Sequence, residues 1–104
     1  MQQAHIFITG KVQGVGFRQF ILKQARKRGL TGWVQNLPAR NATHSVAGGP
    51  DGKVEAVIQG ERKLIEELLV DAKKGPFLSR VHTIETKWEE LMTFMPTFTI
   101  KHPQ

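Results

Sequence analysis

The order in which hydrophobic periodicity changes along the chain is the feature that most restricts its fold. Alternation of apolar and polar residues indicates strands, and apolar residues three or four apart indicate amphipathic helices. In chain order the segments are a strand at 5–9, a helix from 17 ending at Lys27-Arg28-Gly29, strands at 30–37 and 54–59, a helix at 64–72 ending at Lys73-Lys74-Gly75-Pro76, a strand at 81–88 and a short strand within 94–100. This order predicts an α+β, ferredoxin-like split β-α-β sandwich: an antiparallel sheet, two helices on one face and a short extra C-terminal strand.

The chain has the length of one domain, and we expect residues 1–104 to form a single domain. It contains no cysteine, which excludes a disulfide, a thiolate metal site and a cysteine nucleophile. No secretory signal pattern is visible, and no apolar run approaches the roughly 20 residues of a membrane span. We therefore expect a cytoplasmic protein with no membrane contact. The histidines show no metal-ligand spacing, so no metal site is expected; they are His5, His44, His82 and His102.

Positive charge is concentrated in the first half of the chain. Residues 1–50 contain seven Lys or Arg and no Asp or Glu, whereas residues 51–104 contain eight Lys or Arg and nine carboxylates. A half without carboxylates attracts anions, so nucleic acid and a small phosphorylated molecule are both candidate partners. A solvated basic surface that aids solubility explains the charge equally well.

A glycine-rich stretch joins the first strand to the first helix. Gly10, Gly14 and Gly16 allow a close approach of backbone N–H groups to a ligand, and a helix start carries free N–H groups that favour an anion. Arg18 follows in the first helical turn, where the dipole disfavours a cation by about 0.3–1 kcal/mol unless an anion is bound. The pattern is not a Walker A loop, because it lacks a Gly-Lys-Ser/Thr ending, and it is not a dinucleotide fingerprint, because Gln19 stands where the third glycine would be. A tight turn with an exposed arginine remains the alternative.

Two motifs in the chain resemble those of the acylphosphatase family. Gly10-Lys11-Val12-Gln13-Gly14-Val15-Gly16-Phe17-Arg18 is similar to the family's signature, and Gly32-Trp33-Val34-Gln35-Asn36 is similar to its second motif. The similarity continues through the Asp51-Gly52 turn, the second helix and Lys74-Gly75-Pro76, so it covers nearly the whole chain.

The resemblance implies a role for particular residues. Arg18 would bind the substrate phosphoryl group, and the backbone amides of Gln13, Gly14, Val15, Gly16, Phe17 and Arg18 would cradle it. Asn36 would position the attacking water. Neither a metal nor a cofactor is implied. An acyl phosphate releases a carboxylate of conjugate-acid pKa ~4, a leaving group that needs no general acid. Positioning and charge stabilisation could therefore suffice, with the substrate's own phosphate accepting the water proton.

Hydrolysis of an acyl phosphate to a carboxylate and inorganic phosphate, by a monomer, is the leading functional hypothesis. One alternative is a regulatory relative that binds phosphate without turnover. Another is a basic nucleic-acid-binding module of ferredoxin-like fold, although the paired-aromatic RNA-recognition motif is not found.

Residues 39–50 form an insertion that family members usually lack between the Asn36 motif and the Asp51-Gly52 turn. A neutral surface loop is one interpretation, because lengthening a loop costs little. The other is a flap beside the active site, to which Arg40 would add positive charge. Shortening Ala39–Pro50 would then change KM for acyl phosphates more than stability.

Overall fold

Five strands and two helices form the fold in the computed structural model, which describes residues 1–37 and 52–102. The elements are β1 (Gln2–Lys11), α1 (Phe17–Lys27), β2 (Thr31–Asn36), β3 (Gly52–Gly60), α2 (Arg62–Lys74), β4 (Arg80–Glu89) and β5 (Phe98–Ile100). The insertion at 39–50 lies outside the described residues. The expected order of strands and helices is confirmed.

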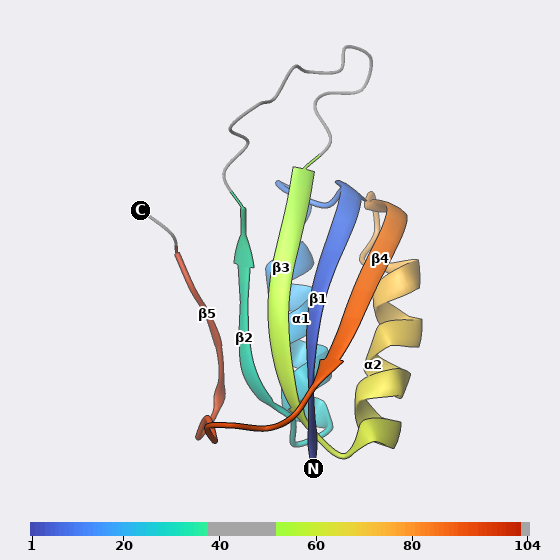
Figure 1. Cartoon of the computed structure of the whole chain (residues 1–104). Coiled ribbons are helices and arrows are strands. Elements are labelled where there is room, and N and C mark those ends of the chain that lie inside the picture. The colour runs from blue at the N-terminus through green and yellow to red at the C-terminus, as the bar shows by residue number, and fades with distance from the viewer. Residues whose placement is uncertain (38–51, 103–104) are drawn as a thin grey trace.

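The sheet has the strand order β4-β1-β3-β2-β5, and both helices cover the same face of it (Figure 1). β1 lies between β3 and β4 and is antiparallel to both, and β2 is antiparallel to β3. This is the ferredoxin-like arrangement that the sequence predicts.

The fifth strand differs from the expectation of a fully antiparallel sheet, because β5 pairs with β2 in parallel. β4 finishes at the end of the sheet where β2 starts. A strand that begins there and returns along β2 therefore runs in the same direction as β2 (Figure 1). The buried side chain of Gln59 holds the connecting segment. Its Nε2 donates to the carbonyl of Thr93 at 2.6 Å, and its Oε1 accepts from the amide of Met95 at 2.9 Å. β5 spans Phe98–Ile100, within the segment expected to contain it.

The core lies between the sheet and the two helices. Alternate residues of β1, Ala4, Ile6 and Ile8, are fully buried, as the period of two requires. They meet the apolar faces of the helices, whose buried residues are Phe17, Ile21 and Ala25 in α1 and Ile65, Leu68 and Ala72 in α2. Each buried apolar side chain of this size contributes about 1.5–3 kcal/mol relative to an exposed one. None of the described helices is long and apolar enough to cross a membrane.

The two motifs lie at the same end of the sheet. β1 and β2 end there, α1 begins there, and β5 runs toward it (Figure 1). The packing of α1 and β5 against β2 therefore determines the shape of the surface at this end of the sheet.

Candidate active site

The loop after β1 depends on two glycines in left-handed backbone conformations. Gly14 has φ 75° and Gly16 has φ 77°, a region that costs other residues roughly 1–2 kcal/mol. Gly16 is the residue before α1, where no side chain caps the helix and the first turn carries no acidic residue. The first helical hydrogen bond runs from the amide of Phe20 to the carbonyl of Gly16 at 3.0 Å. The preceding amides of the helix start are thus available to a ligand.

Gln13 fixes this loop to the neighbouring strands. Its side-chain Nε2 donates to the carbonyl oxygens of Leu37 and Lys53, at 3.0 Å each. Leu37 directly follows Asn36 at the end of β2. The loop that leads to Arg18 at the start of α1 is therefore fixed to the strand end that carries Asn36.

A pocket of about 140 Å³ opens between the loop, the first turn of α1, the end of β2 and the residues around the end of β5. Its lining residues are Val12, Gly14, Gly16, Phe17, Arg18, Gln19, Asn36, Ile100 and His102. Pockets for drug-sized ligands usually measure about 300–1,000 Å³, so this one suits a smaller group.

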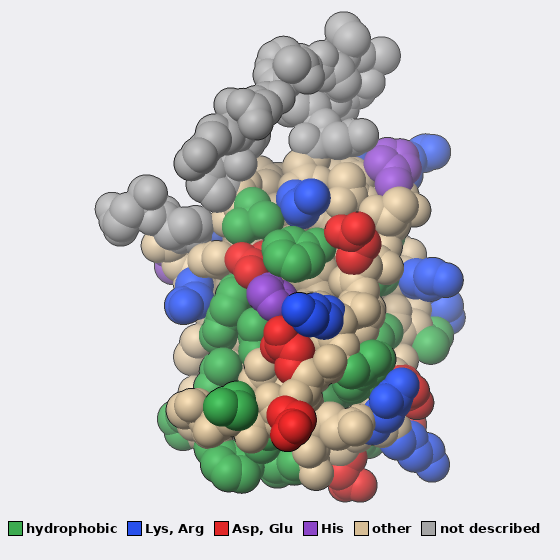
Figure 2. Space-filling view, viewed as in Figure 1, with side chains coloured by type: hydrophobic (Ala, Val, Ile, Leu, Met, Phe, Trp, Pro, Cys, Tyr) green, Lys and Arg blue, Asp and Glu red, His purple; other side chains and the backbone are tan. Residues whose placement is uncertain are grey.

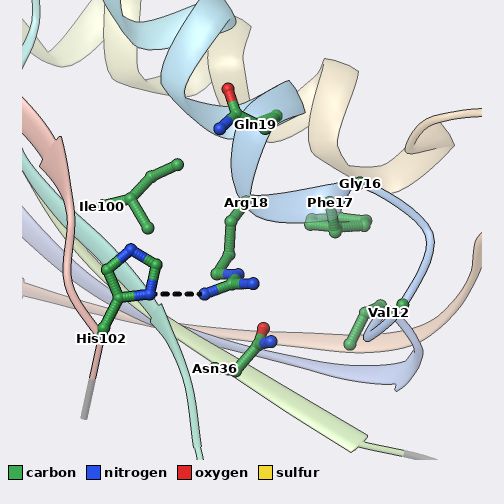
Figure 3. Close-up of a pocket in the computed structure, with 9 residues that line it drawn as sticks. Val12, Gly16, Phe17, Arg18, Gln19, Asn36, Ile100 and His102 are labelled. Atoms are coloured by element: carbon green, nitrogen blue, oxygen red, sulfur yellow. Dashed lines mark hydrogen bonds between the residues drawn. The ribbon is translucent and has the colours of Figure 1, made fainter.

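Three polar side chains converge in this pocket, as Figure 3 shows: Arg18 points into the space between Asn36 and His102. Arg18 Nη1 lies 3.5 Å from His102 Nδ1, a long hydrogen bond. Within residues 1–37 and 52–102, no carboxylate lines the pocket. Among the described lining residues the ionisable side chains are Arg18 and His102, so this lining favours an anion.

Asn36 carries an unpaired acceptor. Its Oδ1 is buried and has no hydrogen-bond partner among the described residues. A buried polar atom without a partner costs about 1–3 kcal/mol, and such atoms are uncommon in native structures. Asn36 is among the lining residues of the pocket, so a water or a substrate group bound there is the candidate donor for this atom.

The structure brings Arg18 and Asn36 into one pocket, together with Gly14, Gly16 and Phe17. Gln13 and Val15 are not among the lining residues, and the side chain of Gln13 is occupied in anchoring the loop. Their proposed contribution is limited to backbone amides.

Sequence reasoning missed four lining residues: Val12, Gln19, Ile100 and His102. Val12 and Gln19 belong to the same local segment as Arg18 and could have been inferred from proximity. Ile100 and His102 enter through the parallel pairing of β5 with β2, in which Val34 is opposite Ile100. No spacing in the sequence signals that contact.

The open face of the sheet does not favour a nucleic-acid backbone. Figure 2 shows acidic and basic side chains interspersed over this face. Glu85 lies opposite Phe7 in the β1–β4 pairing, and Glu55 lies opposite Phe7 in the β1–β3 pairing. Carboxylates at these positions repel phosphates, which dominate nucleic-acid affinity. Within the described residues there is also no group of three or more His, Asp or Glu side chains that could hold a metal ion.

The fold and the pocket together define a small ferredoxin-like domain with a binding site for a compact anion at one sheet edge. The Acylphosphatase family model matches residues 4–100. An acylphosphatase of Thermococcus kodakarensis is 48% identical over 88 residues, covering 85% of this chain and 84% of that protein. One of Methanococcoides burtonii is 43% identical over 98 residues, covering 94% of this chain and 90% of that protein.

The fold comparison agrees. The crystal structure of acylphosphatase from Bacillus subtilis superposes with a TM-score of 0.83 at 31% identity, covering 97% of this chain and 99% of that chain. The chain belongs to the acylphosphatase family. The leading functional hypothesis, hydrolysis of acyl phosphates, is confirmed at the level of the family, and the nucleic-acid alternative is not favoured.

Proposed function

We propose that this chain hydrolyses acyl phosphates in the pocket between Arg18 and Asn36, yielding a carboxylate and inorganic phosphate. The observation that carries the proposal is the unpaired Oδ1 of Asn36 in the same pocket as the Arg18 guanidinium. The guanidinium can hold an anion, and the Oδ1 can hold a water beside it.

Arg18 and the amides of residues 13–18 bind the phosphoryl group. A guanidinium can contact two phosphoryl oxygens at once, and it keeps its charge at every physiological pH. The amides at the start of α1 add fixed dipoles that point at the same oxygens. Since charge on these oxygens is redistributed in the transition state, donors already in place lower the barrier without rearrangement.

Asn36 positions the attacking water through an O–H donated to its Oδ1. The water oxygen forms a bond to phosphorus while the bond from phosphorus to the acyl oxygen breaks. The carboxylate leaves with the electron pair, and a phosphoryl oxygen accepts the proton of the water. Because a carboxylate is a good leaving group, the step needs no general acid, which agrees with the lack of a carboxyl group among the described lining residues.

The chain acts as a single domain, without metal or cofactor, as a monomer in the cytoplasm. The small pocket, whose described lining residues include no carboxylate, supports a compact anionic substrate bound without a bridging cation.

Hydrolysis of benzoyl phosphate in water enriched in oxygen-18 tests the proposal, with phenyl phosphate as a control that keeps the phosphoryl group but has a poorer leaving group. We expect turnover of benzoyl phosphate only, with the label in inorganic phosphate. Label in benzoate would show attack at the acyl carbon and contradict the proposal. Binding of phosphate without turnover of benzoyl phosphate would instead identify a non-catalytic relative.

A further inference from the structure

His102 stands in the pocket without a part in the reaction described so far. It follows β5 and is exposed, and its Nδ1 lies 3.5 Å from Arg18 Nη1. An arginine guanidinium has no acceptor, so in this contact Arg18 donates and the imidazole accepts. A hydrogen bond in this contact needs a neutral imidazole whose proton is on Nε2.

A protonated imidazole changes this contact. It has two N–H donors and no acceptor, so it cannot bond to Arg18 and instead places a second cation beside the first. Two cations at this separation repel each other unless an anion lies between them. The same two nitrogens are close enough for one phosphoryl group to accept from both.

Among the described residues, no carboxylate around His102 competes with such an anion. From α1 it faces Arg18, and from β2 it faces Asn36, which is uncharged. Its neighbour Lys101 has its ammonium 4.4 Å from the centroid of the Trp33 ring. No Asp or Glu side chain is paired with Arg18 or His102 among the described ion pairs.

We propose that His102 is a second side-chain ligand of the phosphoryl group and binds it as an imidazolium. In the empty pocket the neutral ring holds the Arg18 guanidinium by one long hydrogen bond. When a doubly charged anion enters, it accepts from Arg18 and from the protonated ring, and the pocket takes up a proton. The inference rests on the proposed function, because it uses the same anion site.

The consequence is a dependence of anion affinity on pH. Histidine side chains generally change charge between about pH 5 and about pH 8. The imidazolium is more abundant at low pH, so a doubly charged anion binds more tightly there. Sulfate is the appropriate probe, because it keeps both charges over this range, whereas inorganic phosphate itself titrates.

The dissociation constant of sulfate, measured by calorimetry at about pH 5.5 and about pH 8, tests the proposal. In the wild type we expect roughly tenfold tighter binding at the lower pH, about 1.4 kcal/mol. His102→Gln should bind at both values as weakly as the wild type does at the higher pH. His102→Lys, a permanent cation, should bind tightly at both. His82→Gln, a matched change on β4 outside the pocket, should behave as the wild type.

A His102→Gln variant that keeps the pH dependence of the wild type would overturn the inference, and so would a His102→Lys variant that binds weakly at both values. The Arg18→Ala variant distinguishes an error about the role of His102 from an error about the anion site as a whole. If Arg18→Ala loses sulfate binding while His102→Gln is unchanged, the site stands and the role of His102 falls. If Arg18→Ala binds sulfate as well as the wild type, or if the wild type binds none, the anion site itself is refuted.

The role is also visible in kinetics. A ligand of the phosphoryl group that acts mainly in the ground state changes KM more than kcat. We therefore expect His102→Gln to raise KM for benzoyl phosphate at the lower pH and to leave kcat within about twofold. A loss confined to kcat would contradict a binding role.

Discussion

Gln13 Nε2 donates to the main-chain carbonyl of Leu37 at 3.0 Å, and this bond ties the glycine-rich loop to the end of β2. Gln13 belongs to the loop that leads to Arg18 in α1, and Leu37 directly follows Asn36 of β2. The relative position of Arg18 and Asn36 therefore depends on a glutamine that is not among the lining residues of the pocket.

Gln13→Ala should impair catalysis more than stability. Each lost hydrogen bond costs about 0.5–1.5 kcal/mol, whereas a small displacement of reacting groups can reduce the rate by about 10²-fold. Gln35→Ala is the matched control, because Gln35 lies beside Asn36 but bonds to Glu55 instead, Nε2 to Oε1 at 2.8 Å. Urea unfolding and kcat for benzoyl phosphate measure the two effects. Equal losses of kcat in both variants would argue against the anchoring role.

Gly16→Ala should destabilise the fold modestly and weaken anion binding. A Cβ at Gly16 meets nothing within 4 Å, so the cost arises from the left-handed backbone, roughly 1–2 kcal/mol. Gly29→Ala at the other end of α1 is a close control: its φ is +70°, and the space around its Cβ is equally open. Both variants should lose similar free energy of unfolding, but only Gly16→Ala should bind sulfate less tightly. Unaltered sulfate affinity in Gly16→Ala would show that the helix-start amides do not bind the anion.

Asn36→Ala should separate activity from stability most clearly. Removing a buried acceptor without a partner costs no hydrogen bond within the protein, so the free energy of unfolding should stay within about 1 kcal/mol of the wild type. Loss of the group that holds the water should lower kcat by about 10²–10³-fold, as loss of one positioned polar group does elsewhere. Steady-state kinetics and urea unfolding of the same preparation give both quantities. Wild-type kcat in a folded Asn36→Ala variant would remove Asn36 from the mechanism.

Gln59→Leu should act on the pocket from a distance. The buried side chain bonds to the main chain at Thr93 and Met95, and its loss leaves two polar groups unpaired at about 1–3 kcal/mol each. The same side chain also bonds to Thr31 and Gln3, but only the two main-chain bonds reach this segment. Because the segment leads into β5, Ile100 and His102 should be held less firmly. We expect a lower free energy of unfolding together with a raised KM. Gln3→Ala, which removes the neighbouring bond to Gln59 without touching the segment, should leave KM unchanged.

The sequence predicts what depends on local periodicity. The helices over Phe17–Lys27 and Arg62–Lys74 follow from apolar residues three and four apart, and the glycines before Arg18 mark the anion loop. The direction of β5 cannot be predicted from the sequence, because a three-residue parallel pairing with β2 produces no local sequence pattern. His102 was missed for the same reason, since only that pairing brings it to Arg18. The unpaired Oδ1 of Asn36 is likewise a property of three-dimensional packing. The insertion at 39–50 lies outside the described residues, and its interpretation as a flap stays a prediction.

Arg18 is the residue on which the proposed function depends most. The deciding measurement is kcat/KM for benzoyl phosphate in Arg18→Ala beside Arg62→Ala, an arginine of α2 that pairs with Glu66 outside the pocket, Nε to Oε2 at 3.1 Å. We expect Arg18→Ala to lose about 10³-fold in kcat/KM with its circular dichroism unchanged, and Arg62→Ala to remain within about twofold of the wild type. A folded Arg18→Ala protein with the activity of Arg62→Ala would contradict the assignment of this pocket as the active site.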